Sequence, residues 1–294
     1  MKPFKVFSAS DSRQALALLA EHAPSVKVLA GGTDLLVELK SAADAPAVVV
    51  DISRAEDLKG IAVTDTALRI GALATHSEIM RSPIIRRNFP ALVAAAHTIG
   101  AVQTRNLGTL GGNLVTCVPS MDSGPTLLAL DASVTIAGPR GTREIDLRDF
   151  FVGPRKCCLR PDELLIDIRI PLRNFGKPTT FLKFGLRKGQ ALALVNVAAS
   201  CWVDAEKTVF VEPRIALGAV APTVIRAVRA EAYLAGREAS PGTMAEAGRI
   251  AAGEAKPISD FRASADYRRD LIAVLTQRAL ASNCACLQAQ TVEQ

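Results

Sequence analysis

A glycine-rich stretch over residues 98–113 is the part of this chain whose residue types and spacing first suggest chemistry. Its glycines are Gly100, Gly108, Gly111 and Gly112. Glycine loses more backbone entropy on folding than alanine does, so such a run predicts a loop that adopts positive φ angles or lies against a bulky group. We expect this loop to present backbone N–H groups to a phosphate, because amides that converge on one point bind anions.

A second glycine loop, Ala-Gly-Gly-Thr-Asp over residues 30–34, follows a predicted strand and precedes a predicted helix. That position suits a phosphate site, because the N-terminus of a helix favours negative charge. Neither loop matches the G-x-G-x-x-G fingerprint, and the chain has no G-x-x-x-x-G-K-[ST] motif. A standard Rossmann site and a P-loop are therefore not predicted. From the residues alone, both loops are also compatible with ordinary tight turns.

Few other side chains are arranged for catalysis. The three histidines, His22, His76 and His97, lie far apart in the sequence, and we expect solvated or capping roles for them. The chain has no G-x-S-x-G or H-E-x-x-H motif. If the protein belongs to an enzyme, the sequence predicts that a cofactor carries the chemistry while the chain supplies orientation and electrostatics.

Composition excludes several classes of protein. Of the 294 residues only 4% are aromatic, and the net charge of +6 is spread over the chain, so we expect no nucleic-acid binding. No apolar run is long enough to span a bilayer, and the first residues do not resemble a signal peptide, which predicts a cytoplasmic protein. We interpret the six cysteines as reduced thiols and predict no metal site. They are Cys117, Cys157, Cys158, Cys201, Cys284 and Cys286.

The elements that must position the two glycine loops divide the chain into three predicted parts. In residues 1–54, helices over 11–22 and 34–40 alternate with strands over 26–30 and 47–52, which indicates an α/β unit with a parallel pair. Residues 55–173 combine hairpins that turn at 64–66 and 138–141, a capping box at Thr75, helices that begin at Pro83 and Pro90, a helix over 122–130, and a strand over 163–170. Residues 174–294 hold three predicted antiparallel strands over 181–186, 194–203 and 209–218, followed by three helices over 224–235, 243–253 and 264–287.

Five motifs carry a family resemblance: Ala-Gly-Gly-Thr-Asp-Leu-Leu over 30–36, Thr-Ile-Gly over 98–100, Arg-Asn-Leu-Gly-Thr-Leu-Gly-Gly-Asn-Leu over 105–114, Ser-Met-Asp over 120–122 and Leu-Arg-Pro-Asp-Glu-Leu-Leu over 159–165. They resemble the FAD-binding signatures of the flavoprotein (medium) subunits of molybdenum hydroxylases such as xanthine dehydrogenase and carbon monoxide dehydrogenase. Further likeness at 168–171, 181–183, 215–223, 257–260 and 267–269 extends over nearly the whole chain. The resemblance implies an α+β protein: a two-domain FAD-binding fold of the vanillyl-alcohol-oxidase/PCMH type, plus a C-terminal three-stranded antiparallel sheet with helices.

The resemblance also implies roles for individual residues. The FAD pyrophosphate would be held from the first domain by Leu29, Ala30, Gly31, Gly32, Thr33, Asp34, Leu35 and Leu36, and from the second by Thr109, Leu110, Gly111, Gly112 and Asn113. Ile99 would pack near the flavin or adenine, Asp122 would bind a ribose or adenine group, and Leu165 and Lys183 would lie near the isoalloxazine or ribityl chain. Asp122 could equally cap a helix, Lys183 could be a surface lysine, and Ile99 and Leu165 would be core residues in any fold.

By the same resemblance, the chain would bind FAD without an iron–sulfur cluster of its own. A small subunit would carry [2Fe–2S] clusters and a large subunit the molybdopterin cofactor, in a dimer of heterotrimers. Electrons would pass from the clusters through FAD to NAD⁺, a quinone or another acceptor. Two alternatives stay open at this point: a stand-alone FAD-dependent oxidoreductase with its own substrate, and a non-catalytic α/β binding module.

Overall fold

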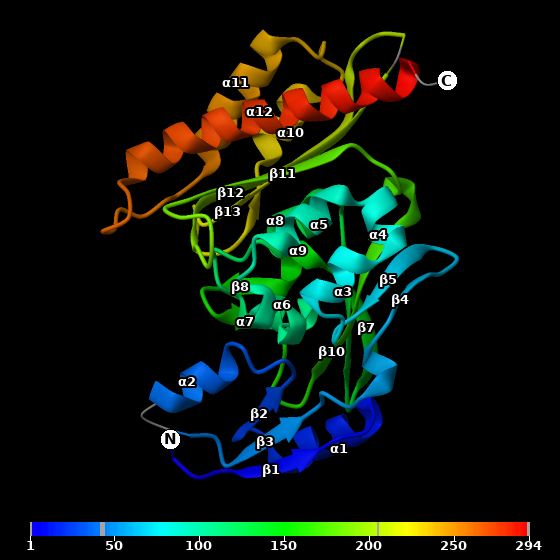
Figure 1. The fold of residues 1–294 in the computed structure, drawn as a ribbon, viewed down its shortest axis with the longest axis vertical. Coiled ribbons are helices and arrows are strands. Elements are labelled where there is room, and N and C mark those ends of the chain that lie inside the picture. The colour runs from blue at the N-terminus through cyan, green and yellow to red at the C-terminus, as the bar shows by residue number, and fades with distance from the viewer. Residues whose placement is uncertain (1, 42–44, 205, 293–294) are drawn as a thin grey trace.

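The computed structural model describes residues 2–41, 45–204 and 206–292, with side chains as far as residue 285. Its three larger β-sheets follow one another along the long axis of the molecule (Figure 1). The N-terminal sheet lies at one end, the central sheet with its cluster of short helices follows, and the C-terminal sheet with three helices lies at the other end. None of the described helices has the length and apolarity that crossing a membrane requires.

The N-terminal unit is a small parallel sheet with two helices. Its strands, in the order β1-β3-β2, are β1 (Lys5–Ser8), β3 (Val48–Asp51) and β2 (Val26–Leu29). Helix α1 (Ser12–His22) begins where the Asp11 side chain accepts from the amide of Gln14 at 2.8 Å, and α2 (Leu35–Ser41) follows the glycine turn. The predicted parallel pair is confirmed, but β1 was missed. Its short sequence gives little indication of a strand. The strand forms because it pairs with β3 along its whole length.

The central unit is an antiparallel sheet covered by short helices. Its strand order is β4-β5-β10-β6-β7, formed by β4 (Ile61–Val63), β5 (Ala67–Gly71), β10 (Leu164–Pro171), β6 (Ser133–Gly138) and β7 (Gly141–Asp146). Both predicted hairpins, β4–β5 and β6–β7, are confirmed. The smaller elements are η1 (Glu56–Leu58), α9 (Leu147–Phe150), β8 (Phe151–Gly153), β9 (Lys156–Cys157) and η2 (Leu172–Asn174).

Local signals predicted most helix starts in this unit. Helix α3 (His76–Arg81) begins at a capping box in which Thr75 and Glu78 bond reciprocally, and α4 (Pro83–Asn88) and α5 (Pro90–His97) each begin at proline. Helix α8 (Ser123–Ala129) was also predicted, and all of its residues are buried. A single core of buried side chains joins these helices to the central sheet and reaches the C-terminal sheet at Phe181 and Ala198.

The glycine-rich stretch departs from the predicted loop. It contains two short helices, α6 (Val102–Leu107) and α7 (Leu110–Thr116), with only Gly108 and Thr109 between them. Gly111 and Gly112 therefore lie in the first turn of a helix. The physical reason for glycine at position 111 is close packing, because a Cβ there would lie 2.6 Å from the carbonyl oxygen of Ala72.

The C-terminal unit is an antiparallel sheet with helices on one face. Its strands are β11 (Thr179–Gly185), β12 (Ala193–Val203), β13 (Phe210–Gly218) and the two-residue β14 (Ile225–Arg226), in chain order. The first three are the predicted strands, and β14 extends the sheet. Helices α10 (Val228–Leu234), α11 (Pro241–Glu254) and α12 (Ala265–Val292) cover the face that points away from the central unit (Figure 1).

The cysteines whose side chains are described are free thiols: Cys117, Cys157, Cys158, Cys201 and Cys284. Cys286 lies outside the described side chains.

Candidate functional site

A cavity of about 360 Å³ lies where the three units meet. The glycine turn after β2 forms one wall, and α3, α7 and the start of β10 form the others. Ala191 and Leu192, from the segment between β11 and β12, reach it from the C-terminal unit. Its lining combines aliphatic side chains, such as Val28, Ile52 and Leu73, with amides and hydroxyls. A planar ring system with a polar tail fits such a mixture.

The turn after β2 carries the strongest anion-binding feature of the cavity. Gly32 has a φ of +72°, a conformation that favours glycine. The five successive amides of residues 31–35 donate to no other described residue, although all five residues line the cavity. Consecutive unpaired N–H groups at a left-handed turn before a helix form a nest that binds phosphate oxygens. The first glycine loop thus has amides available to a phosphate, and its binding of one stays a prediction.

Close contact between two units holds this turn in place. A Cβ on Gly31 would lie 1.9 Å from the carbonyl oxygen of Leu107, at the end of α6. Helix α2 is further tied to the central unit by an ion pair between Glu38 and Arg155. The nest is thus positioned by its packing against α6 as well as by its own sequence.

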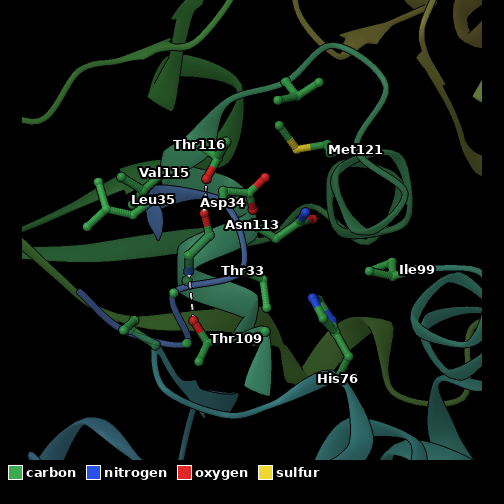
Figure 2. Close-up of a pocket in the computed structure, with 18 of the residues that line it drawn as sticks. Thr33, Asp34, Leu35, His76, Ile99, Thr109, Asn113, Val115, Thr116 and Met121 are labelled. Carbon is green, nitrogen blue, oxygen red and sulfur yellow. Dashed lines mark hydrogen bonds between the residues drawn. The ribbon is translucent and has the colours of Figure 1, made fainter. Parts of the chain in front are cut away.

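The second glycine stretch differs from the first in its backbone amides. The amides of Leu110 and Gly111 donate to the carbonyls of Ala74 and Ala72, both at 2.9 Å. The amide of Gly112 donates to Thr109 Oγ1 at 3.0 Å, and that of Asn113 to the Thr109 carbonyl. All four amides therefore have acceptors within the protein, unlike those of the first loop, and the predicted role of this stretch in holding the pyrophosphate stays a prediction. What α7 offers the cavity is the side chains of Thr109 and Asn113 (Figure 2).

Replacing Thr109 by valine should destabilise the start of α7 without removing the cavity. Valine cannot accept the bond from the Gly112 amide, which Figure 2 shows as a dashed line, and loss of such an N-cap typically costs about 1 kcal/mol. Denaturant unfolding measures this cost. Thr109→Ser keeps the hydroxyl and should lie within about 0.5 kcal/mol of the wild type. Equal stability of the valine and serine variants would contradict the capping role.

The charged side chains that line the cavity are carboxylic acids. Asp34, Asp122 and Glu163 line it, and no lysine or arginine is found among its described lining residues. Burial raises the pKa of Asp34, assisted by the nearby Glu38. Glu163 instead has a lowered pKa, because hydrogen bonds from Arg143 and the Arg160 amide outweigh its desolvation. An anion bound here must therefore be held by backbone amides and neutral side-chain donors.

Two family models together match almost the whole chain. "FAD binding domain in molybdopterin dehydrogenase" covers residues 2–173, and "CO dehydrogenase flavoprotein C-terminal domain" covers residues 180–282. The chain belongs to this family of FAD subunits. The boundary predicted within the first region, near residue 54, stays a prediction.

Relatives and solved structures agree with the family. The chain is 34% identical over 276 residues to "Xanthine dehydrogenase FAD-binding subunit" from Escherichia coli O157:H7. This match covers 92% of the chain and 93% of that protein. It is 30% identical to "Carbon monoxide dehydrogenase medium chain" from Hydrogenophaga pseudoflava, over 94% of the chain and 96% of that protein. The structure of carbon monoxide dehydrogenase from the same organism matches with a TM-score of 0.91 and 31% identity, covering 97% of this chain and 99% of that one. Quinoline 2-oxidoreductase from Pseudomonas putida 86 matches with a TM-score of 0.89 and 29% identity, over 96% and 98% of the two chains.

These matches confirm the fold expected from the resemblance, an FAD-binding region followed by a C-terminal flavoprotein domain. The cavity also fits the cofactor named by the family model, because its unpaired amides suit a pyrophosphate and its aliphatic walls suit the rings. Of the residues predicted to bind FAD, the cavity is lined by Ala30, Gly31, Gly32, Thr33, Asp34, Leu35, Ile99, Thr109, Gly111, Gly112, Asn113, Asp122 and Leu165. Leu29, Leu36, Leu110 and Lys183 are not among its lining residues.

In this FAD subunit Asp122 and Lys183 bind each other. Their side chains are only 6% and 8% exposed, and the Lys183 ammonium donates to both the Asp122 carboxylate and the Thr98 carbonyl. Asp122 also accepts from Thr98 Oγ1 at 3.0 Å and from Asn196 Nδ2 at 2.9 Å. Burial raises the pKa of Asp122, while its three donors act in the opposite direction. The surface-lysine interpretation of Lys183 is wrong, and Asp122 occupies the N-cap position of α8 without bonding to a helix amide.

Sequence reasoning missed His76 as a residue of the site. We expected a solvated or capping role, yet its side chain is 2% exposed and lines the cavity (Figure 2). The only local signal was its place directly after the capping residue Thr75. Nothing in the sequence indicated that α3 would pack beside the nest.

Proposed function

We propose that this chain carries the FAD of a molybdopterin-dependent dehydrogenase complex. Electrons would arrive from [2Fe–2S] clusters on a small partner subunit, after substrate oxidation at a molybdopterin cofactor on a large subunit. The observation that carries the proposal is the nest of unpaired amides at residues 31–35, facing a cavity with aliphatic walls. Bound FAD supplies the capacity to take up electrons singly and to release them in pairs.

The chain's own residues would bind and orient the cofactor. The amides of residues 31–35 would hold the pyrophosphate, while Thr109 and Asn113 would supply side-chain hydrogen bonds from α7. Ile99 and Leu165 would pack against the rings and exclude water. Asp122 would keep its carboxylate at the cavity, held there by Lys183 and Asn196, with Leu29, Leu36 and Leu110 supporting the two loops from behind.

An electron acceptor would approach from the side of the C-terminal unit. A second cavity of about 410 Å³ shares Ser120 and Leu192 with the first. Its charged lining residues are Lys256, Asp260, Arg262 and Arg268, which leaves a positive excess. That charge favours an anionic acceptor such as NAD⁺ over a neutral quinone.

Purification of the tagged chain from the cells that naturally produce it tests the proposal. We expect a yellow complex that releases FAD on denaturation and contains one iron–sulfur and one molybdopterin subunit, with the mass of a dimer of heterotrimers. Anaerobic reduction followed by NAD⁺ or a quinone then identifies the acceptor. A colourless chain that FAD cannot reconstitute would refute the proposal. A yellow chain that purifies alone and oxidises a substrate would establish the stand-alone oxidoreductase instead.

A further inference from the structure

The cavity presents an electrostatic problem for a cofactor with a pyrophosphate. Three carboxyl groups line it, and its described lining residues include neither lysine nor arginine. His76 is the sole described lining residue whose side chain can take up a proton to become cationic. An anion in this cavity therefore has one side-chain partner able to take a positive charge.

His76 lies directly beside the nest. A Cβ built on Gly108 would lie 3.4 Å from Thr33 Oγ1 and 3.5 Å from His76 Cδ2, so the imidazole and Thr33 flank the same glycine. Thr33 belongs to the run of unpaired amides. Figure 2 shows the ring of His76 projecting into the cavity, between Thr33 and Ile99 in that view. A phosphate held by the nest would be within reach of this ring.

The imidazole has no partner within the described protein. Its Nδ1 is completely enclosed without a hydrogen bond, and neither ring nitrogen bonds to a described residue. Buried polar groups in folded proteins almost always have a partner. Because Nδ1 is enclosed, Nε2 is the ring nitrogen that can donate to a ligand in the cavity. The backbone of His76 is held rigidly, because its amide donates to the Gly108 carbonyl at 3.1 Å.

We propose that His76 binds the pyrophosphate of the cofactor, donating a hydrogen bond as a neutral imidazole and gaining a proton on cofactor binding as the pH falls. The inference rests on the proposed function, since it concerns the same cavity. No resemblance motif includes this residue, and its position is set by the packing of α3 against α6.

The surroundings of His76 define the direction of the pH effect. Burial and the nearby Arg105 lower the pKa of His76 to about 4, so the ring is neutral at pH 7 before the cofactor binds. A bound pyrophosphate raises that pKa, because it favours the charged form. Cofactor affinity should therefore increase as the pH falls. Other titratable groups face the ring from the cavity or lie on α3 and the helices packed against it: Asp34, Glu78, Arg81, Arg86, Arg87, His97, Arg105, Asp122 and Glu163.

Two substitutions separate the two parts of the proposal. His76→Gln keeps a neutral donor but cannot gain a proton, whereas His76→Phe removes the donor and keeps a ring. His97→Gln is the matched control, because His97 ends the neighbouring helix α5, is exposed and does not line the cavity. Each variant is purified in its complex and freed of flavin. FAD affinity is then measured between pH 5.5 and 8, with ADP as a probe that has the pyrophosphate and riboflavin as one that lacks it.

At pH 8 we expect His76→Phe to bind FAD and ADP about 10- to 100-fold more weakly, the usual effect of losing a hydrogen bond to a charged group. His76→Gln should lie within about threefold of the wild type there, and riboflavin affinity should not change. As the pH falls to 5.5, the FAD affinity of the wild type and of His97→Gln should rise at least about threefold more than that of His76→Gln. Because His76→Gln retains every other titratable group of the cavity, this difference reports on His76.

Unchanged FAD affinity in His76→Phe would overturn the proposed contact, and identical pH profiles for the wild type and His76→Gln would overturn the proton uptake. If His76→Phe fails to fold by circular dichroism, the pH profile of His76→Gln decides alone. A wild-type complex that binds no FAD would refute the proposed function instead, so the two failures are distinguishable.

Discussion

Replacing Gly31 by alanine is expected to remove the flavin from this protein. The added Cβ would lie 1.9 Å from the carbonyl oxygen of Leu107 and 2.6 Å from its carbon, and these backbone atoms cannot move aside as a flexible side chain can. The nest would have to shift away from α6, which misdirects the amides of residues 31–35. Overpacking costs roughly 1–3 kcal/mol, and lost bonds to a charged phosphate cost a similar amount, so FAD affinity should fall about 100-fold or more.

Two measurements check this effect: the FAD content of the purified complex, and the affinity of the deflavinated protein for FAD. Gly253→Ala is a matched control, because nothing lies within 4 Å of a Cβ there and alanine suits its helix, α11. Gly32→Ala should be milder than Gly31→Ala. Its φ of +72° strains alanine by about 1–2 kcal/mol, but its near neighbours are leucine side chains that can move. Full flavin content in Gly31→Ala would show that the nest does not hold the cofactor.

Replacing Lys183 by methionine should produce the largest loss of stability. Methionine has a similar length but leaves the buried Asp122 carboxylate without its cationic partner. Removing one member of a buried ion pair typically costs about 3–5 kcal/mol. The pair also joins α8 of the central unit to β11, so we expect the C-terminal unit to lose its fixed position and FAD binding to weaken with it.

A double-mutant cycle distinguishes this role from a direct contact of Lys183 with FAD. Asp122→Asn combined with Lys183→Met removes both charges and leaves no unpaired ion, so it should regain about 1–3 kcal/mol of the stability lost by Lys183→Met alone. Thermal and denaturant unfolding of the four proteins, each with and without FAD, gives the coupling. Two results together would show that Lys183 acts on the cofactor instead. The effects of the two substitutions on stability would be additive, and the Lys183→Met protein would keep wild-type stability but bind FAD more weakly.

Interactions over three or four residues were predictable from the sequence because both partners lie within one short segment. The reciprocal bonds of Thr75 and Glu78 define the start of α3, and proline defines the starts of α4 and α5. The hairpins β4–β5 and β6–β7 likewise follow from short alternating segments around a turn. The two glycine loops and the other motifs that resemble those of the family identified the family and its cofactor before any geometry was known.

Which loop has unpaired amides was decided only by the tertiary structure. Both loops contain adjacent glycines, yet the amides of Leu110 and Gly111 meet the carbonyls of Ala74 and Ala72, whereas those of residues 31–35 meet no described partner. An amide is available to a ligand only if no distant carbonyl reaches it, and that depends on how β5 and α7 pack. The same long-range packing encloses His76 and brings Lys183 to Asp122, 61 positions away in the chain. Local hydrogen bonding thus determined the elements, and packing between elements determined which of their groups face the cofactor.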